Sequence, residues 1–330
     1  MSNKDESPAC IDIREDDLLA LSAEVLDTLL RDHTTGKNIF WATHDYEALG
    51  SEYDYHSEIL PELITGEHGM VIRPRVLKSK ENQTDRAKDM AEVFTSSWVC
   101  NAQNNLIDEA WFGRKDVFNV EDTTNHTWKA KTNKIEYPQG KTWKDYVRAT
   151  RMEITCGEAP YLVSRYDATT GESIPLLERI GLLDRKLRVI SENVDVSGEW
   201  LDWAQVAYKN IYGFEWQGDN LLLAREALLW TFIEYYQAKF QKAPLLKSIN
   251  YIAYIISWNL WQMDGLKGVV PNSCKNGVTE KIQTLFGEEE KTINCAGCQQ
   301  DDIRKHNGIY CLIRDWPNDK KKIRFIDLMK

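Results

Sequence analysis

Apolar residues recur at helical spacing in several segments of the chain and form short continuous runs in others. Residues 16–30 show the first amphipathic helical pattern, and a second covers residues 84–110 with a break near 94–97. In the second half, runs that favour strands alternate with longer helical segments. The runs that favour strands are Arg151–Thr155, Lys186–Ile190 (which fits a helix equally well), Ile211–Glu215 and Trp258–Met263. Helices are predicted over residues 198–210, 219–240 and 244–256. Asp219 is the predicted N-cap of the helix over 219–240.

This alternation predicts an α/β fold in which helices cover both faces of a parallel sheet. Residues 112–142 are rich in Lys, Asn, Thr and Asp, and we expect them to form a long connection with one hairpin. That connection separates a mainly helical N-terminal region, residues 1–142, from an α/β domain, residues 143–330. Ligands of such sheets bind at the carboxyl ends of the strands, so we expect the functional residues there.

The composition narrows the class of protein. With 42% hydrophobic and 28% charged residues, the 330-residue chain is typical of globular proteins and is not a mainly disordered one. Its formal charge of −10 argues against a protein that grips nucleic acid across its whole surface, although a locally basic groove or a basic partner stays compatible with it. No apolar run approaches the roughly 18 residues of a membrane span. The chain does not start like a secretory signal, so we expect a cytoplasmic location and no membrane contact.

The first predicted strand leads into a turn that could approach a ligand. Glu153 stands at the strand end, and the turn runs through Thr155, Cys156 and Gly157 to Pro160. A small residue followed by glycine lets the backbone come close to a bound group. An ordinary strand-to-helix turn would have the same composition, so this segment alone leaves both interpretations open.

Two further strand ends also carry acidic residues. Glu215 ends the Ile211–Glu215 run and could accept both ribose hydroxyls of a nucleoside, or it could be a solvated loop residue. Asp264 follows the Trp258–Met263 run and could accept from the amine of an adenine, or it could simply precede the turn at Gly265. Trp216 or Trp261 offers an apolar ring as a wall. Together the three acids favour a nucleoside-binding edge.

The sequence resembles adenine-specific DNA methyltransferases of restriction–modification systems, in particular the subunit M group of type II systems. The segment Glu-Ile-Thr-Cys-Gly-Glu-Ala-Pro-Tyr-Leu at 153–162 is similar to the first motif of the family, acid-Pro-x-Cys-Gly-x-Gly-x-Phe-Leu. Residues 211–215 with Ala224-Arg225 resemble the second motif, and residues 262–266 the third. Upstream, Glu-Val-Phe-Thr-Ser-Ser-Trp-Val at 92–99 resembles the Phe-Thr-Pro motif of the cofactor lid. All four stand in the order of the family.

The resemblance implies a Rossmann-like sheet that binds S-adenosylmethionine and transfers its methyl group to an adenine amine in DNA. Phe94 and Thr95 would cover the methionine end of the cofactor, and the turn from Glu153 to Pro160 would lie beneath it. Glu215 would bind the ribose with Trp216 beside it, and Asp264 would accept from the adenine amine.

The chain departs from the family pattern in ways that affect function. Ser96 replaces the usual Pro, and Ala159-Pro160 replace the second Gly. The catalytic Asn/Asp-Pro-Pro-Tyr/Phe loop, which holds the flipped adenine, is absent from the sequence; the nearest segment is the reversed Trp316-Pro317-Asn318. Residues 322–328 are predicted to form the strand that would lead to that loop.

These departures suggest a split enzyme. A second methyltransferase subunit would then supply the catalytic loop and target recognition, and double-stranded DNA would be bound through the complex. The alternatives are an inactive methyltransferase fold kept as a binding module, and a methyltransferase that acts on RNA or protein.

Four of the seven cysteines gather near the C-terminal end of the chain. Cys274, Cys295, Cys298 and Cys311 have a spacing that suggests a structural zinc in an insertion at about 270–315, with His306 inside the last interval. Cys295-Ala-Gly-Cys298 fits a zinc knuckle because its glycine allows a tight turn. Unligated thiols and a redox Cys-x-x-Cys pair are the alternatives.

Overall fold

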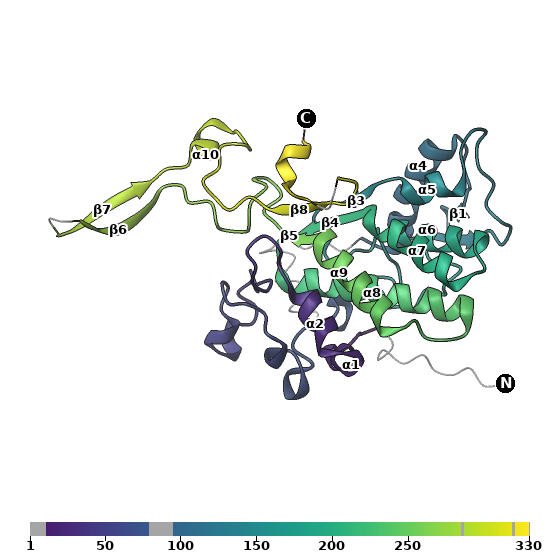
Figure 1. Ribbon diagram of the computed structural model, residues 1–330, viewed down its shortest axis with the longest axis horizontal. Helices are drawn as coiled ribbons and strands as arrows, with labels where there is room; N and C mark the ends of the chain where they lie inside the picture. The colour runs from purple at the N-terminus through teal and green to yellow at the C-terminus, as the bar shows by residue number, and fades with distance from the viewer. Residues whose placement is uncertain (1–10, 79–94, 285–286, 319–320, 330) are drawn as a thin grey trace.

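The computed structural model describes residues 11–78, 95–284, 287–318 and 321–329 (Figure 1). Its helices are α1 (Glu15–Leu21), α2 (Ala23–Leu30), α4 (Ser97–Phe112), α5 (Trp143–Arg148), α6 (Leu182–Asn193), α7 (Ser197–Lys209), α8 (Gly218–Phe240), α9 (Leu246–Asn259) and α10 (Ala296–Gln300). Its strands are β1 (Asn119–Asp122), β2 (Thr127–Ala130), β3 (Arg151–Glu153), β4 (Ile211–Glu215), β5 (Leu260–Gln262), β6 (Val278–Thr284), β7 (Gly287–Ile293), β8 (Leu312–Asp315) and β9 (Lys321–Arg324).

The centre of the fold is a parallel three-stranded sheet in the order β3-β4-β5. Three of the four predicted strand segments supply it, and the bounds of β4 match the predicted run from Ile211 to Glu215. The mixed α/β character of the prediction is therefore confirmed. The fourth segment, Lys186–Ile190, lies inside α6, as its helical alternative allowed.

The two faces of this sheet have different coverings. Helices α7, α8 and α9 contact it from one side, where Ile211 and Leu260 join the main hydrophobic core. On the other side, Tyr212, Phe214 and Trp261 belong to a second cluster completed by the β8–β9 hairpin. A helical layer therefore covers one face only within the described part of the chain.

The described part of the N-terminal region packs against the α/β part and shares its hydrophobic core. Leu29 from α2 and Trp41 share the main cluster with Leu221 and Ile256, which come from α8 and α9. Between α2 and α4, the described residues form turns, isolated bridges and short 3-10 helices. The continuous core crosses the expected boundary at residue 142.

Local hydrogen bonding explains where several predicted elements differ. The predicted helix over 16–30 is two helices, because Ser22 is extended and its side chain caps α2 by accepting from the Glu24 amide at 3.2 Å. Asp219 is not an N-cap, since α8 begins at Gly218 and the Asp219 carboxylate instead accepts from the Tyr46 hydroxyl at 2.8 Å. The part of the second predicted helix before residue 95 lies outside the described residues, and α4 covers 97–112.

Within the described residues, three antiparallel hairpins lie outside the parallel sheet. Strands β1 and β2 form the hairpin expected within residues 112–142. The predicted strand over 322–328 is only partly a strand: β9 pairs antiparallel with β8, and residues 325–328 turn into a 3-10 helix. Figure 1 shows the β6–β7 hairpin projecting away from the helical body, with α10 near its base. No helix among the described residues is long and apolar enough to span a membrane.

Candidate functional site

The acidic residues predicted at the strand ends lie at the carboxyl edge of the parallel sheet. Glu153 is the last residue of β3 and pairs with Gly213, while Glu215 ends β4 and pairs with Gln262. Asp264 follows β5 by two residues. All three side chains are buried. Besides burial, the negative charge of Glu215 raises the pKa of Glu153, so the two carboxyl groups lie near each other. The sheet thus brings Glu153 and Glu215 together.

Glu153 holds the following loop in place. Its carboxylate accepts from the backbone amides of Tyr161 at 3.4 Å and Leu162 at 3.2 Å. Burial raises the pKa of Glu153 well above its ordinary value, despite these hydrogen bonds, and the nearby Glu215 raises it further. Glu153 therefore ties the end of β3 to the backbone at residues 161–162.

The turn after β3 has an unusual backbone. Thr155, Gly157 and Ala159 all have positive φ angles, of 47°, 52° and 62°. Such angles are strained for Thr and Ala and natural for Gly. A Cβ added at Gly157 would meet no atom within 4 Å, so open space lies beside this backbone. The half-buried Pro160 follows, and its ring restricts the backbone φ angle where the turn ends.

Cys156 points from the turn toward β4 and packs there. A Cβ added at Gly213 would lie 3.3 Å from its sulfur, and burial raises the pKa of Cys156 well above its ordinary value. The residue is therefore a neutral thiol that joins turn and sheet.

Glu215 links two loops through backbone hydrogen bonds. One carboxylate oxygen accepts from the Gly157 amide at 2.7 Å, and the other accepts from the amides of Trp216 at 2.9 Å and Gln217 at 3.3 Å. Burial raises the pKa of Glu215 against the effect of these donors. A carboxylate has about four acceptor positions, so these three donors leave about one open for a ligand.

Asp264 caps the turn that follows β5. One carboxylate oxygen accepts from the amides of Leu266 at 3.0 Å and Lys267 at 3.2 Å, and the other lies 3.4 Å from Lys267 Nζ. This matches the interpretation of Asp264 as a turn residue before Gly265.

The aromatic residues beside this edge are Trp216 and Tyr55. Trp216 Nε1 donates to the Tyr55 hydroxyl at 2.8 Å, and the charge of Asp264 raises the pKa of Tyr55 in addition to burial. Trp261 lies on the opposite face of the sheet, within the second cluster. Tyr55 was not foreseen, because the aromatic-rich stretch around it has no regular period.

The two lid residues are placed differently. Phe94 lies outside the described residues, and Thr95 comes directly before α4. Burial raises the pKa of Tyr161 and the side chain of Thr95 lowers it, so the start of α4 lies near the loop held by Glu153.

The reversed Trp316-Pro317-Asn318 segment lies far from the carboxyl edge. It follows β8, and Trp316 Nε1 donates to Asn259 Oδ1 at 2.8 Å. Asn259 directly precedes β5, so the segment lies at the amino ends of the strands.

A second group of chemically active side chains gathers at the base of the β6–β7 hairpin. Cys274 precedes β6, Cys295 and Cys298 flank the start of α10, and His306 follows. The sulfur of Cys274 lies 3.4 Å from that of Cys295 and 3.6 Å from that of Cys298. His306 Nδ1 lies 3.5–3.6 Å from all three sulfurs.

These distances suit a tetrahedral metal site. Zinc bonds thiolate sulfur at about 2.3 Å and imidazole nitrogen at about 2.0 Å, so its ligands lie roughly 3.5–3.8 Å apart. The four ligand atoms lie within 4.8 Å of one another, and the cluster could hold a metal ion.

Backbone geometry supports this arrangement. A Cβ at Gly297 would lie only 2.6 Å from the His306 amide nitrogen, so glycine lets the Cys-x-x-Cys turn press against His306. Although burial opposes ionisation, hydrogen bonds from the Cys298 and Asn307 amides lower the pKa of Cys295 to about 6. A thiolate at this position is ready for metal.

The fourth ligand position differs from the predicted one. Cys311 is buried between β5 and β8, and its sulfur donates to the Gln262 carbonyl at 3.4 Å. Pairing of β8 with β9 draws Cys311 into the second cluster, away from the other three cysteines. His306 takes the place expected for Cys311. The Cys298-x7-His306 interval in the sequence was the signal that could have found it.

Comparison of the chain with protein-family models, curated proteins and solved structures finds no match to any of them.

Proposed function

We propose that this chain binds S-adenosylmethionine at the carboxyl edge of β3, β4 and β5, as one subunit of a split DNA adenine methyltransferase. The observation that carries the proposal is the meeting of Glu153 and Glu215 at that edge beside a left-handed turn with open space at Gly157. Ligands of parallel sheets bind at such edges. The fold would then be a Rossmann-like methyltransferase sheet.

Each predicted residue has a role in this proposal. Phe94 and Thr95 cover the methionine end, and the turn from Glu153 to Pro160 supports it. Glu215 uses its remaining acceptor position for the ribose, with Trp216 beside it, and Asp264 accepts from the adenine amine. S-adenosylmethionine supplies an activated methyl group, and the protein contributes by orienting that group.

The second polypeptide would provide what this sequence lacks. No Asn-Pro, Asp-Pro or Pro-Pro step occurs among the 330 residues, and an adenine amine needs such a loop to be held for methylation. The charge of −10 also suits a chain that leaves most DNA phosphate contacts to its partner.

We further propose that the ion of the Cys274, Cys295, Cys298 and His306 cluster is a structural Zn²⁺. Three thiolates and one imidazole form a closed tetrahedral set, which is typical of structural zinc and leaves no position for a substrate. The ion would fix the base of the β6–β7 hairpin, since a two-stranded hairpin alone is marginally stable in water.

The experiment combines this chain with the product of a neighbouring reading frame that contains an Asn-Pro-Pro-Tyr/Phe segment. Transfer of a labelled methyl group from S-adenosylmethionine to adenine in DNA is measured for each chain and for the complex. We expect transfer by the complex only. Full activity of this chain alone contradicts the split enzyme, and an inactive complex that binds no cofactor favours the non-catalytic binding module.

A further inference from the structure

The face of the parallel sheet opposite α7, α8 and α9 is only partly covered. The β8–β9 hairpin packs Ile313 and Ile323 over the β4 and β5 side of this face. On the β3 side, Met152 is 37% exposed and Ile154 is 67% exposed. Among the described residues, β3 pairs with β4 alone and is an edge strand. Parallel sheets are normally buried on both faces, so this surface is incomplete.

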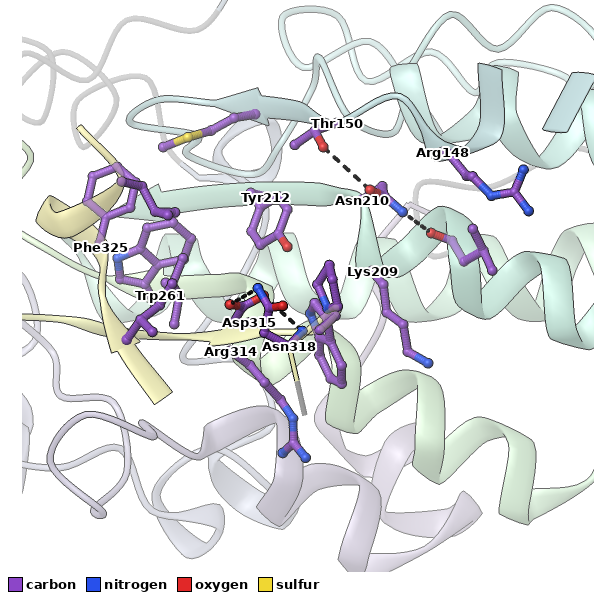
Figure 2. A pocket seen from close by; sticks show the side chains of 17 residues that line it. Arg148, Thr150, Lys209, Asn210, Tyr212, Trp261, Arg314, Asp315, Asn318 and Phe325 are labelled. Carbon is purple, nitrogen blue, oxygen red and sulfur yellow. Dashed lines mark hydrogen bonds between the residues drawn. The ribbon is translucent and has the colours of Figure 1, made fainter. Parts of the chain in front are cut away.

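A cavity of about 660 Å³ lies between the uncovered strand and the β8–β9 hairpin (Figure 2). Its walls include Met152, Tyr212, Trp261, Ile313 and Phe325, which are apolar or aromatic. Figure 2 shows Tyr212 between the Trp261 and Phe325 side chains on one side and Asn210 and Lys209 on the other. Leu328, which is exposed, extends the apolar surface beyond the cavity.

The polar rim of the cavity is cationic. Arg148 lies over the Trp203 ring, and Lys209 lies over the Tyr251 and Trp316 rings. Within the described ranges, neither cation forms an ion pair with an acidic side chain. Asp315 is the acidic lining residue, and its carboxylate accepts from the Asn318 backbone and side-chain amides. The rim is therefore positively charged, although the chain as a whole has a formal charge of −10.

We propose that this cavity is the docking surface for the second polypeptide of the split enzyme, which inserts an amphipathic helix bearing acidic side chains. The inference rests on the proposed function, which supplies the second chain. A helix is the element that usually covers a parallel sheet. Its apolar face fits the aromatic floor, and its acidic residues complement Arg148 and Lys209.

The cationic rim of the docking surface and the cofactor edge lie at opposite ends of the strands. Arg148 and Thr150 precede β3, and Lys209 and Asn210 precede β4, whereas Glu153 and Glu215 end these strands. Changes at the cavity rim can therefore weaken docking without touching the residues assigned to the cofactor.

The test measures the affinity of this chain for the polypeptide with the Asn-Pro-Pro-Tyr/Phe segment, using isothermal titration. The variant is the double charge reversal Arg148→Glu, Lys209→Glu, and the control is Lys242→Glu, at an exposed position after α8 that does not line the cavity. We expect the double variant to lose at least tenfold in affinity and the control to keep the original affinity. Thermal melting and S-adenosylmethionine binding of the double variant show whether it is folded.

The outcomes separate this inference from the proposed function. A complex that methylates DNA but binds the double variant as tightly as the original chain overturns the docking surface and leaves the split enzyme standing. Hydrogen exchange of that complex provides a second readout, in which new protection must include β3 and the β8–β9 hairpin. Protection confined to other elements also overturns the docking surface. If the two chains form no complex, the proposed function fails and the inference fails with it.

Discussion

His306 faces three sulfur atoms through one ring nitrogen, Nδ1, at 3.5–3.6 Å. The Asn307 amide donates to Cys295 Sγ at 3.4 Å, and such N–H to sulfur bonds orient and stabilise thiolate ligands. The Cys311 sulfur, by contrast, donates to the Gln262 carbonyl and lies in the second hydrophobic cluster. Metal binding should therefore depend on His306 and be independent of Cys311.

Metal content of the purified chain measures this difference. We expect one zinc ion per chain in the original protein and in Cys311→Ala, and substantially less than one in His306→Ala and Cys298→Ala. A loss of zinc in Cys311→Ala, with zinc retained in His306→Ala, would contradict this assignment and favour Cys311 as the fourth ligand.

His33 is a residue at which pH should affect stability. Its Nε2 lies 2.9 Å from the Ser257 hydroxyl, and its ring stacks on Trp258 with centroids 3.8 Å apart. Burial, together with the nearby cations Arg225 and Lys322, lowers the pKa of His33 from 6.5 to about 3. The folded state thus holds this histidine neutral.

Because the folded pKa is lower than the unfolded one, protons bind preferentially to the unfolded chain. The contribution of His33 to stability is present above about pH 6.5 and is lost as the pH falls toward 3. Chemical denaturation of His33→Phe between pH 7 and pH 4 should show a shallower decline than the original chain. Parallel declines would mean that His33 does not titrate in this way.

At the scale of elements, α8 starts where the N-terminal region touches the cofactor edge. The Gly218 amide donates to the Trp41 carbonyl at 3.0 Å, and a Cβ at Gly218 would collide with the Phe40 carbonyl oxygen. Glycine is thus required at this position for residues 40–41 to pack against the helix start, directly after Glu215-Trp216-Gln217.

We expect Gly218→Ala to lower the free energy of unfolding by about 1–3 kcal/mol, the usual cost of forcing extra volume into a packed site. Gly198→Ala is the matched control, since a Cβ there meets no atom within 4 Å and Gly198 also lies in a helix, α7. Urea denaturation of both variants provides the comparison. Equal stabilities of the two variants would show that residues 40–41 do not pack as described.

The elements also show which features can be predicted from a sequence. Long apolar segments such as α8 and short apolar runs such as β4 were predicted closely, because the length and composition of such a segment indicate its type of element. Glu153 and Glu215 were expected at one edge of the sheet because the carboxyl ends of parallel strands meet there. Asp219 and Cys311 were misassigned because their surroundings come from distant segments, Tyr46 for the first and Gln262 for the second.

At the scale of the whole molecule, distinct chemical surfaces lie in separate places. The carboxyl edge of the sheet has buried acids and a left-handed turn, and one face has an apolar cavity with a cationic rim at the amino end. The cysteine–histidine cluster lies at the base of the β6–β7 hairpin, which projects from the body (Figure 1). This separation suits a subunit that holds a cofactor at the carboxyl edge of its sheet and a partner on one face of it.

Isothermal titration with S-adenosylmethionine tests the central claim most directly. The account predicts saturable binding of one cofactor per chain, by the chain or by its complex. Glu215→Ala should weaken binding by about 1–3 kcal/mol, as expected for loss of a hydrogen bond to a charged group. Glu199→Ala, at an exposed position on α7, should bind as the original chain does. Absence of binding by both the chain and its complex, or equal affinity in a folded Glu215→Ala, would contradict the account.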